Sequence, residues 1–163
     1  MLNIIFIVLM GDFNFMEKII IDENQFFRTI SRISHEIIEK HHTLDNLVIV
    51  GIKRRGAEIA ALIKHKIKEL TQVELPSFDL DITFYRDDLA PAQEERVPIY
   101  SGASDFINIQ HKDVILVDDV LFTGRTIRAA LDALVDFGRA AKVELVIFVD
   151  RGHRELPIRA DYV

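Results

Sequence analysis

The sequence contains no cysteine among its 163 residues. Neither a disulfide framework nor a metal site built on thiolates is therefore available to the chain. This absence fits a protein that works in a reducing compartment. We therefore expect a cytoplasmic protein.

The chain also lacks an excess of positive charge. Lysine and arginine together number 20 against 26 aspartate and glutamate residues, which gives a formal net charge of −6. A protein that coats nucleic acid without regard to sequence relies on a broadly positive surface, so this balance argues against that class. Any contact with RNA has to use a local basic patch.

Long hydrophobic runs are missing as well. The apolar start of the chain, MLNIIFIVLM at 1–10, is too short to span a bilayer and has neither a positive leader nor a small-residue cleavage site. We therefore expect no signal peptide and no membrane partner. Because MEKIIID at 16–22 resembles a fresh start that leads into a strand, we interpret Met1–Phe15 as an extension upstream of an initiator Met16. The alternative is an extra edge strand.

The length and the apolar share of 49% suffice for one sizeable core, and we expect a single domain over 16–163. There is no internal repeat or low-complexity tract. The last residues, Arg159–Val163, resemble the start of a strand, so we expect the natural polypeptide to continue beyond them. The stretch Arg86–Lys112 has several charges but little periodicity, as lids and disordered segments do. Its position between two strands that bring acids to the same sheet edge favours a functional lid.

Apolar periodicity predicts strands that alternate with helices. Asp22 and Gln25 resemble a capping box, and the apolar spacing after them predicts an amphipathic helix over about 23–41. A second helix has its apolar positions at Ile59, Ile63, Ile67 and Leu70, and a third runs over Arg125–Phe137. Strands are predicted over 46–50, 78–84, 113–118 and 142–149. This order implies an α/β fold, with a mainly parallel twisted sheet and helices on both faces.

The residues that indicate chemistry lie in VILVDDVLFTGRT at 114–126. Asp118 and Asp119 stand at the carboxyl end of a buried strand, and ligands of parallel sheets bind beyond the carboxyl ends of the strands. Adjacent carboxylates there are costly unless donors such as sugar hydroxyls satisfy them. Thr123–Thr126 then opens a helix, whose N–H groups and positive dipole end form a site sized for a monophosphate. The alternative is that Asp119 and Thr123 only cap a turn and a helix.

This loop is not a Walker A motif, which needs Gly-Lys-Ser/Thr after a longer glycine-rich turn. A second candidate surface is the polar face of the first helix. Its members are Arg28, Ser31, Arg32 and His35. A hydroxyl, guanidinium groups and an imidazole thus project from one neighbourhood, although a solvated helix face is the alternative interpretation.

The unit at 114–126 resembles the motif with which type I phosphoribosyltransferases bind 5-phosphoribosyl-1-pyrophosphate (PRPP). Four segments narrow the resemblance to the PyrR family, the pyrimidine-operon attenuation regulators that are also uracil phosphoribosyltransferases. They are LVIVGIKRRGAEIA at 47–60, LDITFYRDDL at 80–89, VILVDDVLFTGRTIRAALDAL at 114–134 and VDRGHRELPIRADYV at 149–163. The resemblance covers about 17–163 and implies the type I phosphoribosyltransferase fold, with a small hood and a flexible loop.

The resemblance implies that uracil and PRPP react to give uridine monophosphate (UMP) and pyrophosphate, with Mg2+ carried on PRPP and no metal held by the protein alone. Asp118 and Asp119 would hold the ribose hydroxyls. The 5-phosphate would be wrapped by Leu121, Phe122, Thr123, Gly124, Arg125 and Thr126.

Further roles follow from the same resemblance. The pyrophosphate loop would be formed by Ile52, Lys53, Arg54, Arg55 and Gly56, whose cations suit a departing diphosphate, although a solvated basic turn is the alternative. A mobile catalytic loop would begin at Arg86, Asp87 and Asp88. The uracil ring would be covered by Val149, Asp150, Arg151, Gly152 and Ile158.

The second implied function is RNA binding under the control of the uridine nucleotides UMP and UTP. The partner would be the leader mRNA of the pyrimidine (pyr) genes, and the outcome would be transcription attenuation. The resemblance implies RNA contacts at Ser31, His35, Arg154 and Arg159, and proximity adds Arg32, Arg151 and His153. The family often has threonine at position 31, where serine keeps the hydroxyl. Such a patch binds an exposed RNA loop through phosphates and base edges.

Two alternatives stay open on the sequence alone. One is a uracil phosphoribosyltransferase without RNA regulation, and the other is a uridine-nucleotide sensor without catalysis. The intact Asp118–Asp119 pair and the TGRT loop speak against the second. A homodimer or a higher even-numbered homo-oligomer is implied by the resemblance only.

Overall fold

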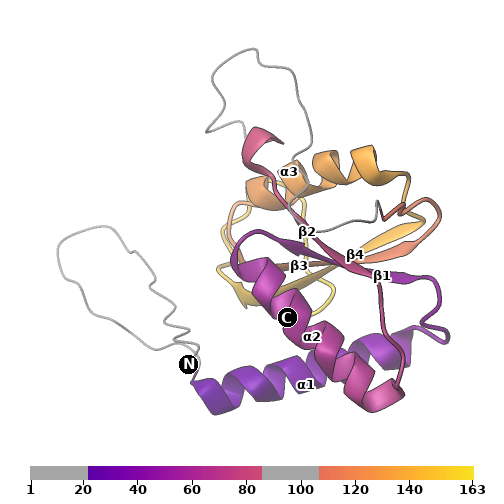
Figure 1. Cartoon of the computed structure of the whole chain (residues 1–163). Helices are drawn as coiled ribbons and strands as arrows, with labels where there is room; N and C mark the ends of the chain where they lie inside the picture. Colours follow the sequence, from indigo (N-terminus) through magenta and orange to yellow (C-terminus); the bar gives the residue numbers. More distant parts are fainter. Residues whose placement is uncertain (1–21, 86–106) are drawn as a thin grey trace.

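The computed structural model describes residues 22–85 and 107–163, which are built around a parallel sheet (Figure 1). The four strands lie in the order β2-β1-β3-β4. They are β1, Leu47–Ile52; β2, Ser77–Leu80; β3, Asp113–Leu121; and β4, Lys142–Asp150. All neighbouring pairs are parallel, so the strands end at the same edge of the sheet. The predicted α/β class is confirmed.

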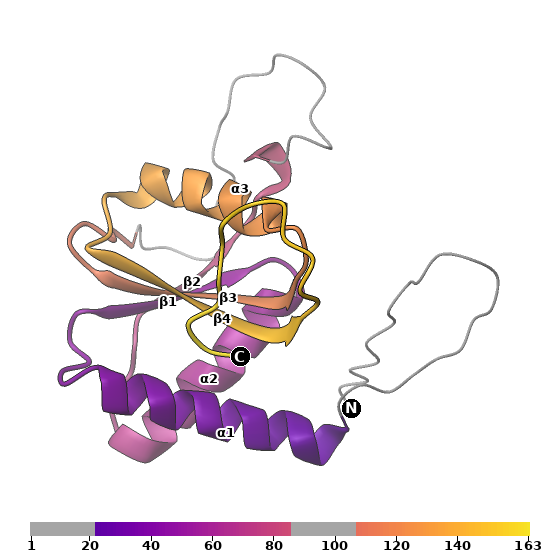
Figure 2. The ribbon, with the colours of Figure 1, turned by 180° about the vertical axis from the view of Figure 1, so that it is seen from behind.

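Helices cover both faces of the sheet, as predicted. They are α1, Glu23–Lys40; α2, Arg55–Thr71; and α3, Arg125–Leu134. α1 and α2 lie on one face and α3 lies on the other, as Figures 1 and 2 show from opposite sides. The sheet is thus the middle layer of three.

Strand β1 shows how the sequence fills both cores. Leu47 and Ile49 belong to the core that contains α1 and α2, whereas Val48 and Val50 belong to the core that contains α3. Successive side chains of a strand point to opposite faces of a sheet. Because both faces are covered, the strand has an unbroken apolar sequence rather than an alternating one.

The capping box at the start of α1 is confirmed. The Asp22 carboxylate accepts a hydrogen bond from the backbone N–H of Gln25 at 2.7 Å, and the Gln25 side-chain oxygen accepts one from the backbone N–H of Asp22 at 3.1 Å. These bonds satisfy donors that have no partner within the helix. The buried apolar face of α1 then consists of Phe26, Ile30, Ile33 and Ile37.

The strand predicted over 78–84 ends at Leu80, so the prediction for its last part is wrong. The carboxylate of Asp81 accepts hydrogen bonds from the backbone N–H of Thr83 at 3.1 Å and from the Thr83 hydroxyl at 2.6 Å. Such local bonds compete with sheet pairing and favour a turn. The chain continues as a 3-10 helix, η1, at Thr83–Tyr85.

The helix predictions are wrong at one position. The third helix runs to Phe137 as predicted, with its last turn, η2 at Val135–Phe137, a 3-10 helix, and Gly138 then turns the chain with a φ of 120°. Leu70, predicted on the apolar face of α2, is 41% exposed. The buried positions of α2 end at Ile67, so its last turn extends past the core.

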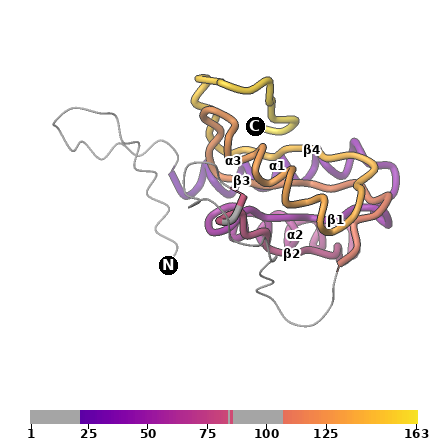
Figure 3. Tube along the Cα trace, turned by 90° about the horizontal axis from the view of Figure 1, so that it is seen from above, coloured from indigo at the N-terminus to yellow at the C-terminus, as the bar shows by residue number. Residues whose placement is uncertain are grey.

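The chain after β4 returns and pairs with it at a single position. Tyr162 forms a parallel bridge with Val146, and the backbone N–H of Ile147 donates to the Tyr162 carbonyl at 3.0 Å. Figure 3 shows this segment next to β4, at the edge of the sheet opposite β2. A single bridge is not a strand, so the strand start expected within Arg159–Val163 stays a prediction.

Two predictions lie outside the described residues. These are the extension Met1–Phe15 and the greater part of the lid, residues 86–106. Within 22–85 and 107–163, no helix combines the length and the apolar character that a membrane crossing needs.

Candidate functional site

Two adjacent acids lie near the carboxyl end of β3. The predicted strand ended at Asp118, but β3 runs on to Leu121, so Asp119 lies within the strand as well. Asp118 is only 6% exposed, and its carboxylate accepts the backbone N–H of Asp119 at 2.9 Å. Burial, together with the neighbouring Asp119 charge, raises the pKa of Asp118 to about 7. The pair is therefore costly to ionise, unless a ligand donates hydrogen bonds to it.

The start of α2 lies directly against these acids. A Cβ atom at Gly56 would lie 2.4 Å from the Val117 carbonyl oxygen and 3.1 Å from the Asp118 Cα, so glycine is what allows this approach. An Arg55 guanidinium nitrogen lies 3.5 Å from the Asp119 carboxylate. The structure thus brings the basic turn predicted for diphosphate to the edge that carries the acidic pair.

The rest of the basic turn faces the same edge. The peptide bond between Lys53 and Arg54 is cis, and Arg54 and Arg55 are exposed. The Lys53 ammonium lies 3.9 Å from the carboxylate of Asp81, the residue that follows β2. Hydrogen bonds from Thr83, together with Lys53, lower the pKa of Asp81 despite its partial burial. Asp81 was given no role from the sequence, because the strand predicted over 78–84 placed it in the middle of a strand rather than at the end.

The loop between β3 and α3 has the geometry expected of the predicted anion site. Gly124 has a φ of 94° and stands at the N-cap of α3, where it turns the chain sharply into the helix. The first N–H groups of a helix have no partners within it, and the helix dipole favours an anion beside them. Thr123, Arg125 and Thr126 are all at least partly exposed, so this helix start is open to a ligand.

The segment predicted to cover uracil lies against this loop. The backbone N–H of Arg151 donates to the Leu121 carbonyl at 2.9 Å, and the Arg151 guanidinium lies 4.1 Å from the centre of the Phe122 ring. Ile158 is half-buried, and its Cδ1 atom lies 3.3 Å from where a Cβ of Gly124 would stand. The structure thus brings the segment that begins at Val149 together with the proposed phosphate loop.

Known proteins resemble this chain closely. A model of the phosphoribosyl transferase domain family matches residues 17–163. The bifunctional protein PyrR of Pasteurella multocida is 82% identical over 149 residues, which cover 91% of this chain and 82% of that protein. The bifunctional protein PyrR of Haemophilus influenzae is 76% identical, and the match covers 91% of this chain and 83% of that protein. The chain belongs to the PyrR family.

Solved structures show which fold this PyrR-family chain has. A hypoxanthine phosphoribosyltransferase from Staphylococcus aureus superposes with a TM-score of 0.69 at 22% identity, over 90% of this chain and 76% of that one. The hypoxanthine phosphoribosyltransferase of Trypanosoma cruzi gives a TM-score of 0.70 at 19% identity, over 94% of this chain and 79% of that one. At such identities the similarity concerns the fold alone, and it confirms the predicted phosphoribosyltransferase fold.

The RNA-contact residues expected from the PyrR family lie in two places. Arg32 and His35 are exposed on α1, where Ser31 is partly exposed. Arg32 donates to the Glu36 carboxylate at 2.7 Å and to the Val163 carbonyl, so α1 and the C-terminal segment meet at this surface. Arg159, four residues before Val163, is exposed as well. This part of the prediction therefore concerns residues that a partner can reach.

Arg154 is placed differently from the other residues of the predicted RNA set. Its side chain is 21% exposed and donates to the carbonyls of Phe122 and Ile158, both at 2.9 Å. It therefore belongs to the junction between the phosphate loop and the uracil cover. Arg86, the remaining predicted catalytic residue, lies outside the described residues.

A buried carboxylate far from this site was not anticipated. Glu144, in the first half of β4, is 1% exposed and accepts hydrogen bonds from Lys40 at 2.8 Å, His41 at 2.7 Å and the Tyr162 hydroxyl at 2.8 Å. Lys142 also contacts it. Burial opposes ionisation, but these donors together hold the pKa of Glu144 at about 2. The only signal in the sequence was one charged residue within the apolar run of a predicted strand.

Proposed function

We propose that this chain is a uracil phosphoribosyltransferase that also regulates pyrimidine genes by binding their leader mRNA. In the enzymatic reaction, uracil displaces pyrophosphate from PRPP and UMP is formed. One observation carries the proposal: the acids of β3, the N-terminus of α3 and residues 150–158 meet at one edge of the sheet. Groups suited to ribose, phosphate and base are therefore side by side, in a chain of the PyrR family.

The β3–α3 unit would hold the ribose 5-phosphate half of PRPP. Asp118 and Asp119 would accept hydrogen bonds from ribose hydroxyls, which offsets the cost of keeping Asp118 buried. Leu121–Thr126 would wrap the phosphate, with backbone N–H groups directed at its oxygens. The Arg125 guanidinium lies 2.8 Å from the Glu155 carboxylate, so Arg125 would serve the phosphate through its backbone.

The basic turn at Lys53–Gly56 would face the diphosphate. During the reaction the bond between the anomeric carbon and the diphosphate oxygen breaks as the bond to a uracil nitrogen forms, through a state that resembles an oxocarbenium ion. Cations beside the leaving diphosphate stabilise the charge that develops on it. Arg86 would join them when the lid closes.

Mg2+ would arrive with PRPP and neutralise part of the diphosphate charge. This ion is usually held by one or two carboxylates together with substrate phosphates and water, and the oxygens of Asp118 and Asp119 fit that donor set. Val149–Gly152 and Ile158 would cover the uracil ring and exclude water, which would otherwise compete for the reacting carbon.

Regulation would use the exposed residues on α1 and near the C-terminus. Ser31, Arg32 and His35 offer a hydroxyl, a guanidinium and an imidazole on one helix face, and exposed Arg159 adds a further cation. Such groups suit the phosphates and base edges of an RNA loop. A local patch is sufficient despite the net charge of −6. Binding would depend on UMP or UTP at the enzymatic site and would promote transcription attenuation.

The proposal also covers the location of the protein, its assembly and its N-terminal segment. We place it in the cytoplasm, as a homodimer or a higher even-numbered homo-oligomer. Met1–Phe15 is proposed to be an extension outside the catalytic domain, and the match to the domain family, which begins at residue 17, supports this interpretation.

The enzymatic proposal is tested by pyrophosphate release from PRPP in the presence of Mg2+. We expect release to depend on uracil, with hypoxanthine and orotate giving little above background. Hypoxanthine is the informative comparison, because enzymes for this base share the fold. Turnover of hypoxanthine or orotate without turnover of uracil would contradict the proposed substrate.

The regulatory proposal is tested by binding to the leader transcript of the organism's own pyr genes. We expect UMP to strengthen binding to this transcript over a scrambled RNA of equal length at physiological salt. Because phosphate contacts are sensitive to salt, both RNAs have to be compared at the same ionic strength. Equal binding of the two RNAs would contradict the regulatory proposal and leave only the enzymatic one.

A further inference from the structure

Hydrogen bonds join the base-covering segment to the phosphate loop at several points. We call residues 150–158 the hood, residues 121–124 the phosphate loop, and the bonds between them the clasp. In the clasp, the Thr123 carbonyl accepts the backbone N–H groups of Glu155 at 3.0 Å and Leu156 at 3.2 Å. The Leu121 carbonyl accepts the backbone N–H of Arg151 at 2.9 Å. The hood is therefore bonded to the end of β3 and to the loop that follows it.

Arg154 makes the largest single contribution to the clasp. Its Nη1 atom donates to the carbonyls of Phe122 at 2.9 Å and Leu121 at 3.4 Å, and its Nε atom donates to the Ile158 carbonyl at 2.9 Å. Its Nη2 atom lies 2.5 Å from the Asp150 carboxylate. A guanidinium has five N–H donors in a rigid fork, and these contacts occupy most of them. Arg154 thus ties both ends of the hood to the loop.

A second ion pair in the same region is more exposed than the Arg154 contacts and is therefore expected to be weaker. Arg125 and Glu155 pair at 2.8 Å, but their side chains are 60% and 52% exposed. Exposed pairs contribute little to stability, since water competes for both charges. The Arg154 side chain is 21% exposed and most of its acceptors are backbone carbonyls. Water therefore competes less for its charged N–H donors. Arg154, and not the Arg125–Glu155 pair, is therefore expected to decide whether the clasp holds.

We propose that Arg154 is a positioning residue that couples the phosphate loop to the hood, and that it does not contact RNA directly. The inference rests on the proposed function, in which phosphate binds the loop and the base lies under the hood. A ligand that occupies both, such as UMP, would fix the hood through Arg154. The hood carries exposed Arg151 and His153 and leads directly to Arg159. Its position would therefore determine part of the proposed RNA-binding surface.

The coupling is tested with R154Q and R154K, measured against wild type and R139Q by calorimetry. Arg139 is an exposed arginine in the connection that leads into β4, at the other end of the sheet, so R139Q is the matched control. We expect both Arg154 variants to bind UMP at least about tenfold more weakly, because lysine lacks the planar fork and glutamine the charge. Ribose 5-phosphate, which has no base to cover, should change by less than about threefold.

Each other outcome of the binding measurement overturns the inference. Equal losses for UMP and ribose 5-phosphate would show that Arg154 supports the phosphate loop alone. Wild-type UMP affinity in R154K would show that a positive charge is sufficient for UMP binding without the planar guanidinium. Unchanged UMP binding together with weakened leader RNA binding would show that Arg154 contacts RNA directly. With Arg154 as a positioning residue, R154Q instead loses most of the UMP-dependent increase in RNA affinity.

Hydrogen exchange of the ligand-free protein tests the clasp independently of any ligand. The amides of Glu155 and Leu156, which donate to Thr123, should exchange at least about tenfold faster in R154Q and at the wild-type rate in R139Q. Unchanged exchange in R154Q would overturn the inference even if UMP binds as proposed. Faster exchange in a protein that binds no UMP would contradict the proposed function and leave the clasp in place.

Discussion

Asp118 and Asp119 differ in their surroundings although they are neighbours. Asp118 is buried beside the start of α2, whereas Asp119 is partly exposed and lies 3.5 Å from a nitrogen of Arg55. Neither carboxylate is needed to hold the core together, because the apolar residues of β3 before them already fill both of its faces. A ligand with hydroxyl donors explains why two acids stand here better than a structural role does.

The first prediction concerns this pair. In D118N/D119N the acceptors lose their charge, and charge-assisted hydrogen bonds contribute about 1.5–3 kcal/mol each. We therefore expect PRPP to bind at least about tenfold more weakly, measured by calorimetry. Asp132 is exposed on α3, and D132N should bind PRPP as wild type does. Loss of cooperative unfolding in the double variant, without a specific loss of PRPP binding, would indicate a structural role.

The second prediction concerns the titration of Asp118. Its pKa is about 7 in the folded protein against an ordinary value of 3.8, so the folded state keeps a proton that the unfolded state has released. This contribution to stability is complete below about pH 4 and is lost as the pH rises towards about 7, by at most about 1.4 kcal/mol per pH unit. The free energy of unfolding of wild type minus that of D118N should therefore fall over this range. Parallel urea-unfolding results for the two proteins at all pH values would contradict the assignment.

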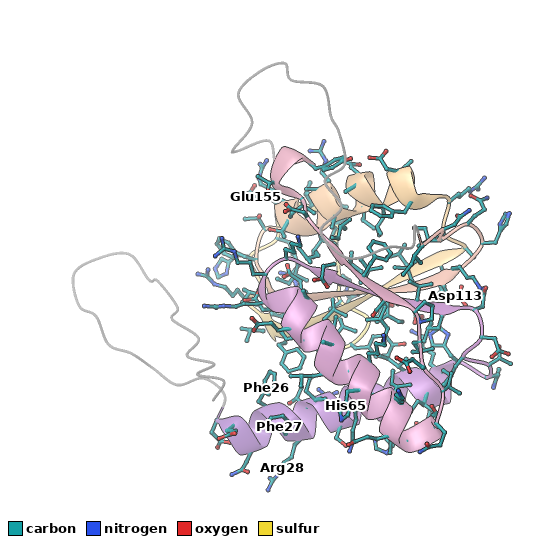
Figure 4. All side chains as sticks on the ribbon, viewed as in Figure 1. Phe26, Phe27, Arg28, His65, Asp113 and Glu155 are labelled. Carbon is teal, nitrogen blue, oxygen red and sulfur yellow. The ribbon has the colours of Figure 1, made fainter. Side chains whose placement is uncertain are left out.

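At the scale of elements, α1 is anchored to the sheet at both ends by different means. Near its start, Phe26 packs on Phe148 with ring centres 5.0 Å apart, and Figure 4 shows Phe26 directed to the core and Arg28 directed away. Near its end, Lys40 and the following His41 bind Glu144. The Glu144 cluster also includes Tyr162, so one carboxylate joins α1, β4 and the C-terminal segment.

The third prediction tests this anchor. E144A leaves the partners of a buried carboxylate unpaired, and we expect the free energy of unfolding to fall by about 3 kcal/mol. This value lies at the lower end of the range usual for a buried ion pair that loses one partner, because Lys40 and Lys142 keep access to water. E144Q retains the shape and an acceptor for Tyr162, so it should lose less. Denaturant unfolding at pH 7 measures both variants.

Acid provides an independent check on Glu144. Its pKa is lowered from 4.5 to about 2, so its stabilisation is present above about pH 4.5 and is lost as the pH falls towards 2. The advantage of wild type over E144Q should therefore vanish in strong acid. Uracil turnover at pH 7 should be unchanged in E144Q, because Glu144 lies near the amino end of β4 and the candidate site lies at the other end. A large fall in turnover would contradict the separation of the two regions.

For the whole molecule, the two proposed functions use different surfaces. The enzymatic groups gather where the strands end, whereas Ser31, His35 and Arg159 lie on α1 and near the C-terminus. Figure 4 labels Glu155 of the hood well apart from Asp113 at the start of β3, which marks the two ends of the sheet. The functions should therefore be separable by mutation, with Arg154 as the exception, because it joins the phosphate loop to the hood.

The fourth prediction follows from this separation. The double variant H35A/R159A removes an imidazole and a cation that are both exposed, and each base or phosphate contact is worth about 1–3 kcal/mol. We expect leader RNA to bind at least about tenfold more weakly, measured by gel shift with UMP present, while uracil turnover stays within about twofold of wild type. A parallel loss of RNA binding and turnover would show that one surface serves both functions.

Much of the fold was predictable because its determinants are local. The capping box at Asp22, the apolar spacing in α1 and α2, and the glycine turn before α3 each depend on residues a few positions apart. The acidic pair and the TGRT loop are also one continuous segment, so the sequence by itself determined the family and was enough to predict a phosphate site. The end of β2 was mispredicted, because hydrogen bonds between Asp81 and Thr83 outweigh the strand pattern there.

Only the tertiary structure decided how distant polar residues pair. Arg154 and Leu121 are 33 positions apart, and His41 and Glu144 are 103 positions apart. Nothing in the local pattern separates an arginine that contacts RNA from one whose donors are bound within the chain. A guanidinium or a carboxylate is tolerated in either setting, provided that partners satisfy it. Only the packing of α1, the sheet and the segment after β4 supplies those partners. The sequence therefore determined which chemical groups are present, and the fold determined which of them remain available to a ligand.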